Sequence, residues 1–115
     1  MNATSERGPR VYVSQDGGHN YGPAEKFGEV VLVSTTELVP WSASFSNQKV
    51  ITGMFDVLRD YRPGVDYILP SGSPLAIITV AHMISNRGDR HLYLKWDARA
   101  NEYFIYNVEM STLGV

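Results

Sequence analysis

The amino-acid sequence predicts a small α/β protein: a mainly parallel sheet with two main helices and a C-terminal β-hairpin, in the order β-β-α-β-α-β-β. Residues 30–33 form an uninterrupted apolar run, which is typical of a parallel strand covered on both faces. Two helical segments separate the strands that follow, and the last third of the chain alternates between apolar and polar residues. Right-handed crossovers would then pack the helices against the sheet and leave an antiparallel strand at its edge.

Length and composition limit the class of protein. The chain has 115 residues, of which 43% are hydrophobic and 19% charged, as expected for one globular domain. The first nine residues are polar and predict a flexible tail, so we expect a single domain over residues 10–115. The net charge of −2 lacks the basic excess of a dedicated nucleic-acid binder.

Cysteine usage and the N-terminal segment bear on location. The chain has no cysteine, which excludes disulfides, thiolate nucleophiles and cysteine-based metal sites. The N-terminal segment has no apolar run typical of a secretory signal. The longest apolar stretch, residues 75–84, is too short to span a bilayer. We therefore expect a cytoplasmic protein that makes no membrane contact.

The strands are assigned from apolar runs. Val11–Val13 is a short strand candidate, followed by a glycine-rich turn region. We expect Val30–Val33 and Tyr67–Leu69 to be adjacent inner strands, because both runs are too apolar for an edge.

The helices are assigned from helical periodicity and capping residues. The first helix should begin after Ser46, with Phe45 and Val50 forming a hydrophobic staple, and should end before Pro63. The second should be capped by Ser73, run to about Asn86 and be mostly buried.

The C-terminal hairpin places Leu92, Leu94 and Trp96 on one face of its first strand. We therefore expect Trp96 to be buried. Asp97, at the end of that strand, should accept hydrogen bonds from the following turn.

Ligands of open α/β sheets bind beyond the carboxyl ends of the parallel strands. Gly72 there precedes a helix N-terminus, whose free N–H groups suit a phosphate or carboxylate. The alternative is a purely structural turn in which Ser73 only caps the helix. The candidate ligand-binding residues are Ser14, Ser34, Thr35, Ser71, Gly72, Ser73 and Arg99.

Other functional patterns are weaker. The three histidines share no metal-ligand spacing, so we predict no metal site, no cofactor and no catalytic residues. Basic residues interleave with aromatics around the hairpin, which suits single-stranded nucleic acid but is also usual for a half-exposed hairpin. The candidate residues for contact with a partner protein are Trp41, Phe45, Tyr93 and Lys95.

Three stretches carry a family resemblance: PAEKFGEVVLV, DYILPSGSPLAIITVAHMI and LYLKWDARANEYFIYNVEM. Together they resemble a family of small uncharacterised phage-encoded proteins. That family has an Asp-Tyr strand, a Gly-Asp-Pro-Ala-like helix start and a Leu-Lys-Trp-Asp-Arg hairpin. The chain departs from the pattern at Ser73, where the family has an acidic residue, and at Ala98, where it has arginine.

Three functions follow as hypotheses. The resemblance implies a phage-encoded accessory protein that binds a host or phage protein without catalysis. The alternative is a protein that binds a small molecule or nucleotide phosphate at the strand-end loops, and the third is a single-strand binder using the hairpin. Self-association is compatible with each of them.

Overall fold

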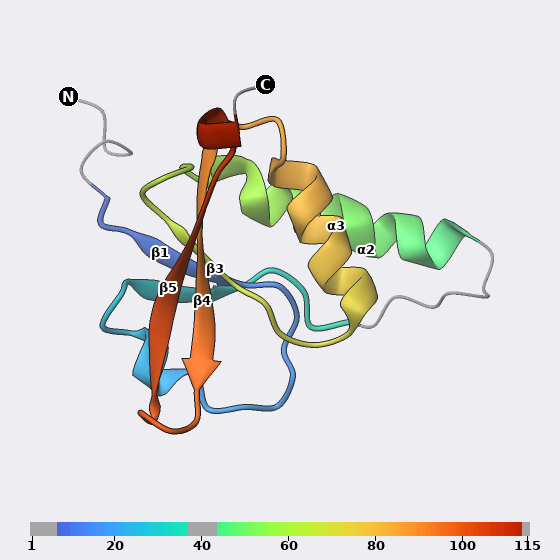
Figure 1. Cartoon of the computed structure of the whole chain (residues 1–115). Coiled ribbons are helices and arrows are strands. Elements are labelled where there is room, and N and C mark those ends of the chain that lie inside the picture. Colours follow the sequence, from blue (N-terminus) through green and yellow to red (C-terminus); the bar gives the residue numbers. More distant parts are fainter. Residues whose placement is uncertain (1–6, 37–43, 114–115) are drawn as a thin grey trace.

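The computed structural model describes residues 7–36 and 44–113, which contain one five-stranded sheet and two α-helices (Figure 1). The strand order is β2-β1-β3-β4-β5, with β1 to β4 parallel and β5 antiparallel to β4. The predicted α/β class and C-terminal hairpin are therefore confirmed. The strands are β1 (Arg10–Val13), β2 (Glu29–Leu32), β3 (Tyr67–Leu69), β4 (Arg90–Asp97) and β5 (Glu102–Glu109). The helices are η1 (Gly22–Ala24), α2 (Ser44–Val57), η2 (Leu58–Asp60), α3 (Pro74–Ile84) and η3 (Met110–Leu113), where η marks a 3-10 helix.

The most deeply buried strand of the sheet is the short inner strand β1. It pairs with β2 on one side and β3 on the other, and Val11, Tyr12 and Val13 are all completely buried. Residues 67–69 do form an inner strand, β3, as predicted. The prediction that residues 30–33 form an inner strand adjacent to it is wrong, because β1 lies between them and β2 is an edge strand. Layers on both faces half-bury Val30 and Val31, and this explains the apolar run without a second neighbouring strand.

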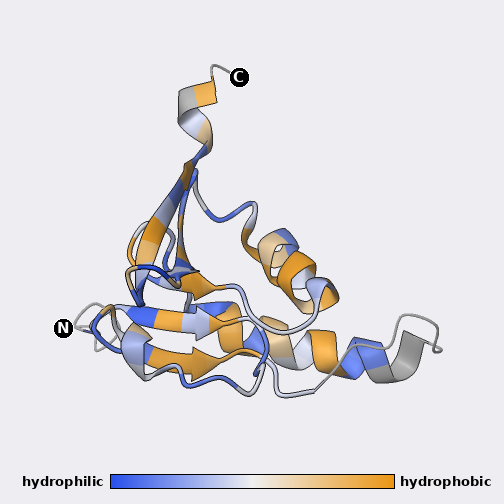
Figure 2. Cartoon of the chain, turned by 60° about the horizontal axis from the view of Figure 1, so that its bottom comes forward, coloured by the Kyte–Doolittle hydropathy of each residue, from blue (hydrophilic) through white to orange (hydrophobic). Residues whose placement is uncertain are grey.

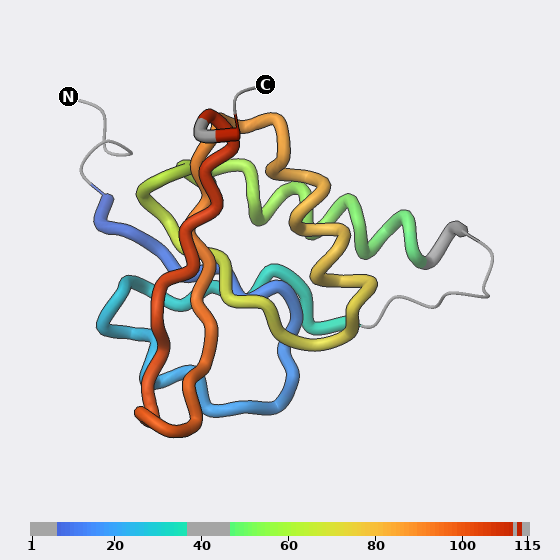
Figure 3. Tube along the Cα trace, viewed as in Figure 1, coloured from blue at the N-terminus to red at the C-terminus, as the bar shows by residue number. Residues whose placement is uncertain are grey.

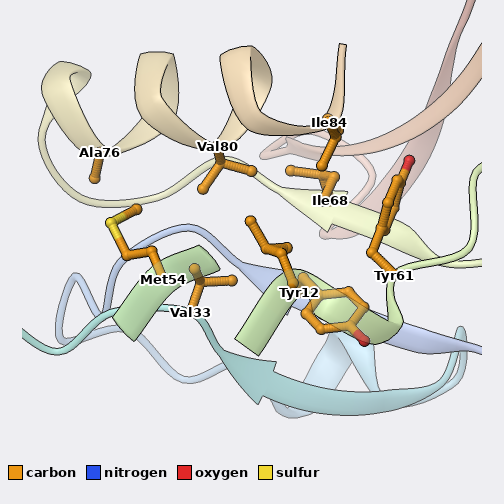
Figure 4. Close-up of a cluster of buried hydrophobic side chains, with 9 residues drawn as sticks. Tyr12, Val33, Met54, Tyr61, Ile68, Ala76, Val80 and Ile84 are labelled. Atoms are coloured by element: carbon orange, nitrogen blue, oxygen red, sulfur yellow. The ribbon is translucent and has the colours of Figure 1, made fainter. Parts of the chain in front are cut away.

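Both α-helices pack on one face of the sheet (Figure 4). In the core there, Met54 of α2 and Leu58 of η2 pack with Val80 and Ile84 of α3 around Tyr12 of β1. The tube in Figure 3 shows the chain passing from α2 towards β3 and on into α3, and the two helices contact each other. A second cluster fills the opposite face; its members are Val11, Val13, Ala24, Leu69 and Leu94.

The helix boundaries differ in detail from those expected. Helix α2 already includes Ser44, so Ser46 lies within the helix and is not its N-cap, contrary to the prediction. The Ser73 cap of α3 is confirmed, since its Oγ accepts a hydrogen bond from the Ala76 N–H at 3.3 Å. The expectation that α3 is mostly buried is wrong on one side, where Ile78 is 62% exposed, because only one face of α3 meets the sheet. No helix within the described ranges is long and apolar enough to cross a membrane.

The described N-terminal residues are tied to the centre of the fold. The Arg7 guanidinium donates to both Asp66 oxygens, at 3.1 and 2.9 Å. Backbone N–H groups of Arg10 and Arg62 donate to the same carboxylate at 2.9 and 2.8 Å. Burial by itself would raise the pKa of Asp66, but these hydrogen bonds outweigh it and hold the pKa below its ordinary value. Arg7, which the sequence placed in a flexible tail, is thus held against the sheet.

The hairpin extends beyond the end of the neighbouring strand β3. Strand β3 pairs with β4 only as far as Tyr93, whereas β4 continues to Asp97 with β5 as its single neighbour. Trp96 lies in this overhang and is 37% exposed, so the prediction that it is buried is wrong. The Asp97 carboxylate accepts from the Arg99 and Ala100 N–H groups at 3.0 and 3.4 Å, which confirms its expected role in the turn.

Candidate functional site

The loop after β3 is fastened to the loop after β1. Ser14 Oγ donates to the Ser71 carbonyl at 2.6 Å and accepts from the Ser71 N–H at 2.8 Å. Both serines are buried, so two predicted site residues do lie together at the carboxyl ends of neighbouring parallel strands. Their shared hydrogen bonds fix the two loops relative to each other.

The start of α3 is occupied by the protein's own side chains. Gln15 Oε1 accepts from the Ser73 N–H at 2.6 Å, and Ser73 Oγ takes the Ala76 N–H. Gly72 has φ +85°, and a Cβ there would lie 2.2 Å from Gln15 Oε1. The glycine therefore makes room for Gln15, a residue that the sequence analysis did not select. Its only sequence signal was its position two residues after the end of β1.

The remaining predicted ligand residues are spread apart. Ser34 is buried and bonds locally to Thr36, accepting from its N–H at 3.1 Å and donating to its carbonyl at 2.9 Å. Thr35 is exposed beside it, and Arg99 lies in the exposed hairpin turn. None of these three residues lines the cleft described next.

A cleft of about 530 Å³, the strand-end cleft, opens beyond the carboxyl ends of the parallel strands. Ser71 and Gly72 form one wall, and Lys95 lines it from β4. The remaining lining residues were not among the predicted ligand-binding or partner-binding residues. They are His19, Asn20, Tyr21, Leu69, Pro70, Leu94, Trp96 and Tyr103.

Tyr21 connects the polar groups that line one side of the strand-end cleft. Its hydroxyl lies 2.9 Å from Ser71 Oγ and accepts from the Gly17 N–H at 2.7 Å. Across the cleft, Trp96 and Tyr103 meet edge to face with ring centroids 4.9 Å apart. Burial, with Tyr21 nearby, raises the pKa of Tyr103, so its hydroxyl stays protonated at neutral pH.

A second cavity, the hairpin groove, lies on the helix side of the hairpin and has a volume of about 510 Å³. It is lined by Pro70, Tyr93, Leu94, Lys95, Phe104, Tyr106 and Val108. The predicted partner residues Tyr93 and Lys95 lie here: Tyr93 is half-buried, with a pKa raised by burial, and Lys95 is exposed. Trp41 and the side chain of Phe45 fall outside the described residues.

The basic residues of the hairpin region have separate partners. Arg90 is within 3.8 Å of Glu109, and Arg87 donates to the Leu58 carbonyl and lies over the Phe55 ring. Both guanidinium groups therefore already have partners within the protein.

The histidines also have separate environments. His91 is buried with its Nδ1 2.6 Å from the Tyr61 hydroxyl, and burial lowers its pKa, which favours the neutral ring. His19 packs edge to face on Tyr21, and His82 lies exposed on α3. Among the described residues no group of acidic and histidine side chains is arranged to hold a metal.

Comparison with known proteins gives a family but no closer guide to the site. Searches of curated proteins and of solved structures found no match. One family model, described as Phage Pam3 gp32-like protein, matches residues 9–110, which include every strand of the sheet. The chain therefore belongs to the phage-encoded Pam3 gp32-like protein family.

Proposed function

We propose that this phage-family protein acts without catalysis, by binding a host or phage protein whose extended segment adds a strand to β5. The observation that carries the proposal is the exposure of three consecutive apolar residues in the middle of an edge strand. Phe104, Ile105 and Tyr106 are 48%, 46% and 59% exposed. Exposed apolar residues are ordinary when single, but a contiguous group on a strand edge favours recognition.

The edge of β5 is open to further pairing. It lies at the end of the sheet and pairs residue by residue with β4 over all eight positions, with no bulge. Natural edge strands are usually protected by lysine, proline or a bulge, and β5 contains neither lysine nor proline. Its unpaired backbone groups therefore suit an added strand.

The hairpin groove supplies pockets for the side chains of such a strand. Phe104 and Tyr106 line it from β5, and Tyr93 and Lys95 line it from β4. In Figure 2 the hairpin rises from the layered part of the molecule, with hydrophobic segments along it. Alternate side chains of an added strand point to one face. The groove therefore fits a segment with alternating apolar residues and one acidic residue opposite Lys95, the charged member of its lining.

Two matched substitutions test the proposal. Phe104→Ser removes an apolar side chain from β5, and Phe55→Ser removes one of the same 48% exposure from α2. Proteins captured from host and infected-host lysates by the wild-type chain should be quantified with each variant. A partner that binds at β5 is expected to bind Phe104→Ser at least tenfold more weakly and Phe55→Ser unchanged.

The captured partner must then be purified and its site located by amide hydrogen exchange. Protection should appear along residues 104–108. The proposal is overturned if every captured protein binds the two variants equally. Concentration-dependent dimers that Phe104→Ser abolishes would also overturn it, because β5 would then serve self-pairing.

A further inference from the structure

We infer that the strand-end cleft is a second binding site, which shares Pro70, Leu94 and Lys95 with the hairpin groove and takes a small planar anion of mononucleotide size. Its volume of about 530 Å³ falls within the roughly 300–1,000 Å³ of pockets that enclose small ligands. It lies where the loops after β1 and β3 meet the overhanging end of β4, which is the usual place for a ligand in this fold class.

The walls favour a flat ring. Trp96 and Tyr103 come from the paired strands of the hairpin, and His19 and Tyr21 come from the loop after β1. Trp96 is 37% exposed although it packs against Tyr103, so part of the indole remains available for contact. Stacking on such rings contributes about 1–3 kcal/mol per base in other proteins and tolerates any base.

The charge of the cleft favours an anion. Lys95 is the only lysine, arginine or carboxylate among the residues that line it. The nearest acidic residues of the hairpin are otherwise engaged: Asp97 accepts from the turn, and Glu102 lies 3.6 Å from Lys26. A single ammonium group binds free phosphate only weakly. We therefore expect one ligand that carries both an aromatic ring and an anionic group.

The cleft is held in shape before any ligand arrives. The Tyr21 hydroxyl is within hydrogen-bond distance of both the Gly17 N–H and Ser71 Oγ. Ser14 Oγ forms two hydrogen bonds with the backbone of Ser71. A Cβ on Gly17 would lie 2.8 Å from Ser71 Oγ, so these loops approach as closely as glycine allows. A rigid wall costs little ordering when a ligand binds.

This site replaces the one expected at the helix N-terminus. Gln15 takes the Ser73 N–H, and Ser73 itself takes the Ala76 N–H, so those donors are already used. Arg99, the countercharge expected from the sequence, does not line the cleft. Lys95, which lines the cleft from β4, takes that role.

NMR titration of the full chain tests the inference. The probes are AMP, GMP, CMP and UMP, with the matching nucleosides and inorganic phosphate as controls, each to a few millimolar. At least one nucleotide should shift the amides of Ser71, Gly72 and Lys95 and the Trp96 indole N–H. The nucleoside should bind more weakly at the same place, and phosphate alone should shift none of these signals.

Two charge-removing variants provide the matched comparison. Lys95→Gln should weaken nucleotide binding at least fivefold and leave nucleoside binding unchanged, whereas Arg99→Gln should change neither. Trp96→Phe, which retains an aromatic ring against Tyr103, should weaken both ligands. Phe104→Ser should leave the nucleotide affinity unchanged, so this site and the partner site on β5 can fail separately.

Three results would overturn the inference. The first is no shift at these positions with any nucleotide at millimolar concentration. The second is an equal loss of affinity in Arg99→Gln and Lys95→Gln. The third is binding of a single-stranded octanucleotide at least tenfold tighter than the corresponding mononucleotide, which would assign the cleft to a polynucleotide strand.

Discussion

Strands β1 and β5 belong to the same sheet, yet their side chains meet opposite surroundings. Val11, Tyr12 and Val13 of β1 are completely buried, whereas no residue of β5 is buried. Strand β1 has a neighbour on each side and a packed layer on each face, while β5 pairs with β4 alone and also contacts the 3-10 helix η1. The comparison indicates that folding stability resides around β1 and β3, whereas β5 is the strand at which we propose that a partner binds. Substitutions in the two regions should therefore have different consequences.

The largest expected loss of stability comes from Asp66, beside the start of β1. Asp66→Ala leaves the Arg7 guanidinium and two backbone N–H groups without their acceptor, at a cost of about 3–5 kcal/mol in the free energy of unfolding. Asp56→Ala is the control, because it breaks an exposed 2.8 Å pair with Arg59 worth under about 1 kcal/mol. Urea unfolding measures both. Similar losses in the two variants would contradict the central role of Asp66.

The same chemical change in β3 and β5 tests the comparison directly. Ile68 is 2% exposed and Ile105 is 46% exposed. Ile68→Ala should cost about 2–5 kcal/mol, because it leaves a cavity in the core. Ile105→Ala should cost less than about 1 kcal/mol, because it only trims an edge strand. If thermal unfolding showed equal losses, β5 would contribute to stability as much as the centre does.

The smallest effect is a dependence on pH. The pKa of Asp66 in the folded protein lies below its ordinary value of 3.8, so the unfolded chain takes up the proton first as the pH falls. The stabilisation by Asp66 is therefore complete above about pH 5 and is lost on acidification through 3.8 and then through the lower, folded value. The stability difference between wild type and Asp66→Asn should shrink across that range, as followed by urea unfolding. A difference that stays constant down to pH 2.5 would show that the carboxylate charge contributes nothing.

Much of the fold could be predicted because its signals are local. Ser73 and Pro74 mark the start of α3, and Asp97 marks the hairpin turn. The order of the strands could not be predicted in the same way, because it depends on pairing between distant segments. The apolar run at residues 30–33 is longer than Val11–Val13, yet β1 is an inner strand and β2 is at the edge, because β3 pairs with β1. The Arg7–Asp66 pair likewise leaves no periodic trace in the sequence.

Part of the lining of the strand-end cleft could be predicted from the sequence. The rule for the carboxyl ends of parallel strands led to Ser71 and Gly72, which do line the strand-end cleft. The rule did not lead to Tyr21 or Tyr103, because each reaches the cleft from an element whose direction depends on the tertiary fold. Trp96 was assigned to the core from strand alternation alone. Alternation specifies the face of a strand but not whether another element covers that face.

The position of β1 between β2 and β3 also affects how the chain can fold during its synthesis. The Arg10 N–H binds Asp66, a residue 56 positions later, so the ribosome must make all the intervening chain before this contact can form. Strand β2 alone can pair with β1 earlier, and a lone pair of strands in water has little stability. Val11, Tyr12 and Val13 are completely buried in the folded protein. During the synthesis of α2 and β3 they therefore remain accessible to chaperones.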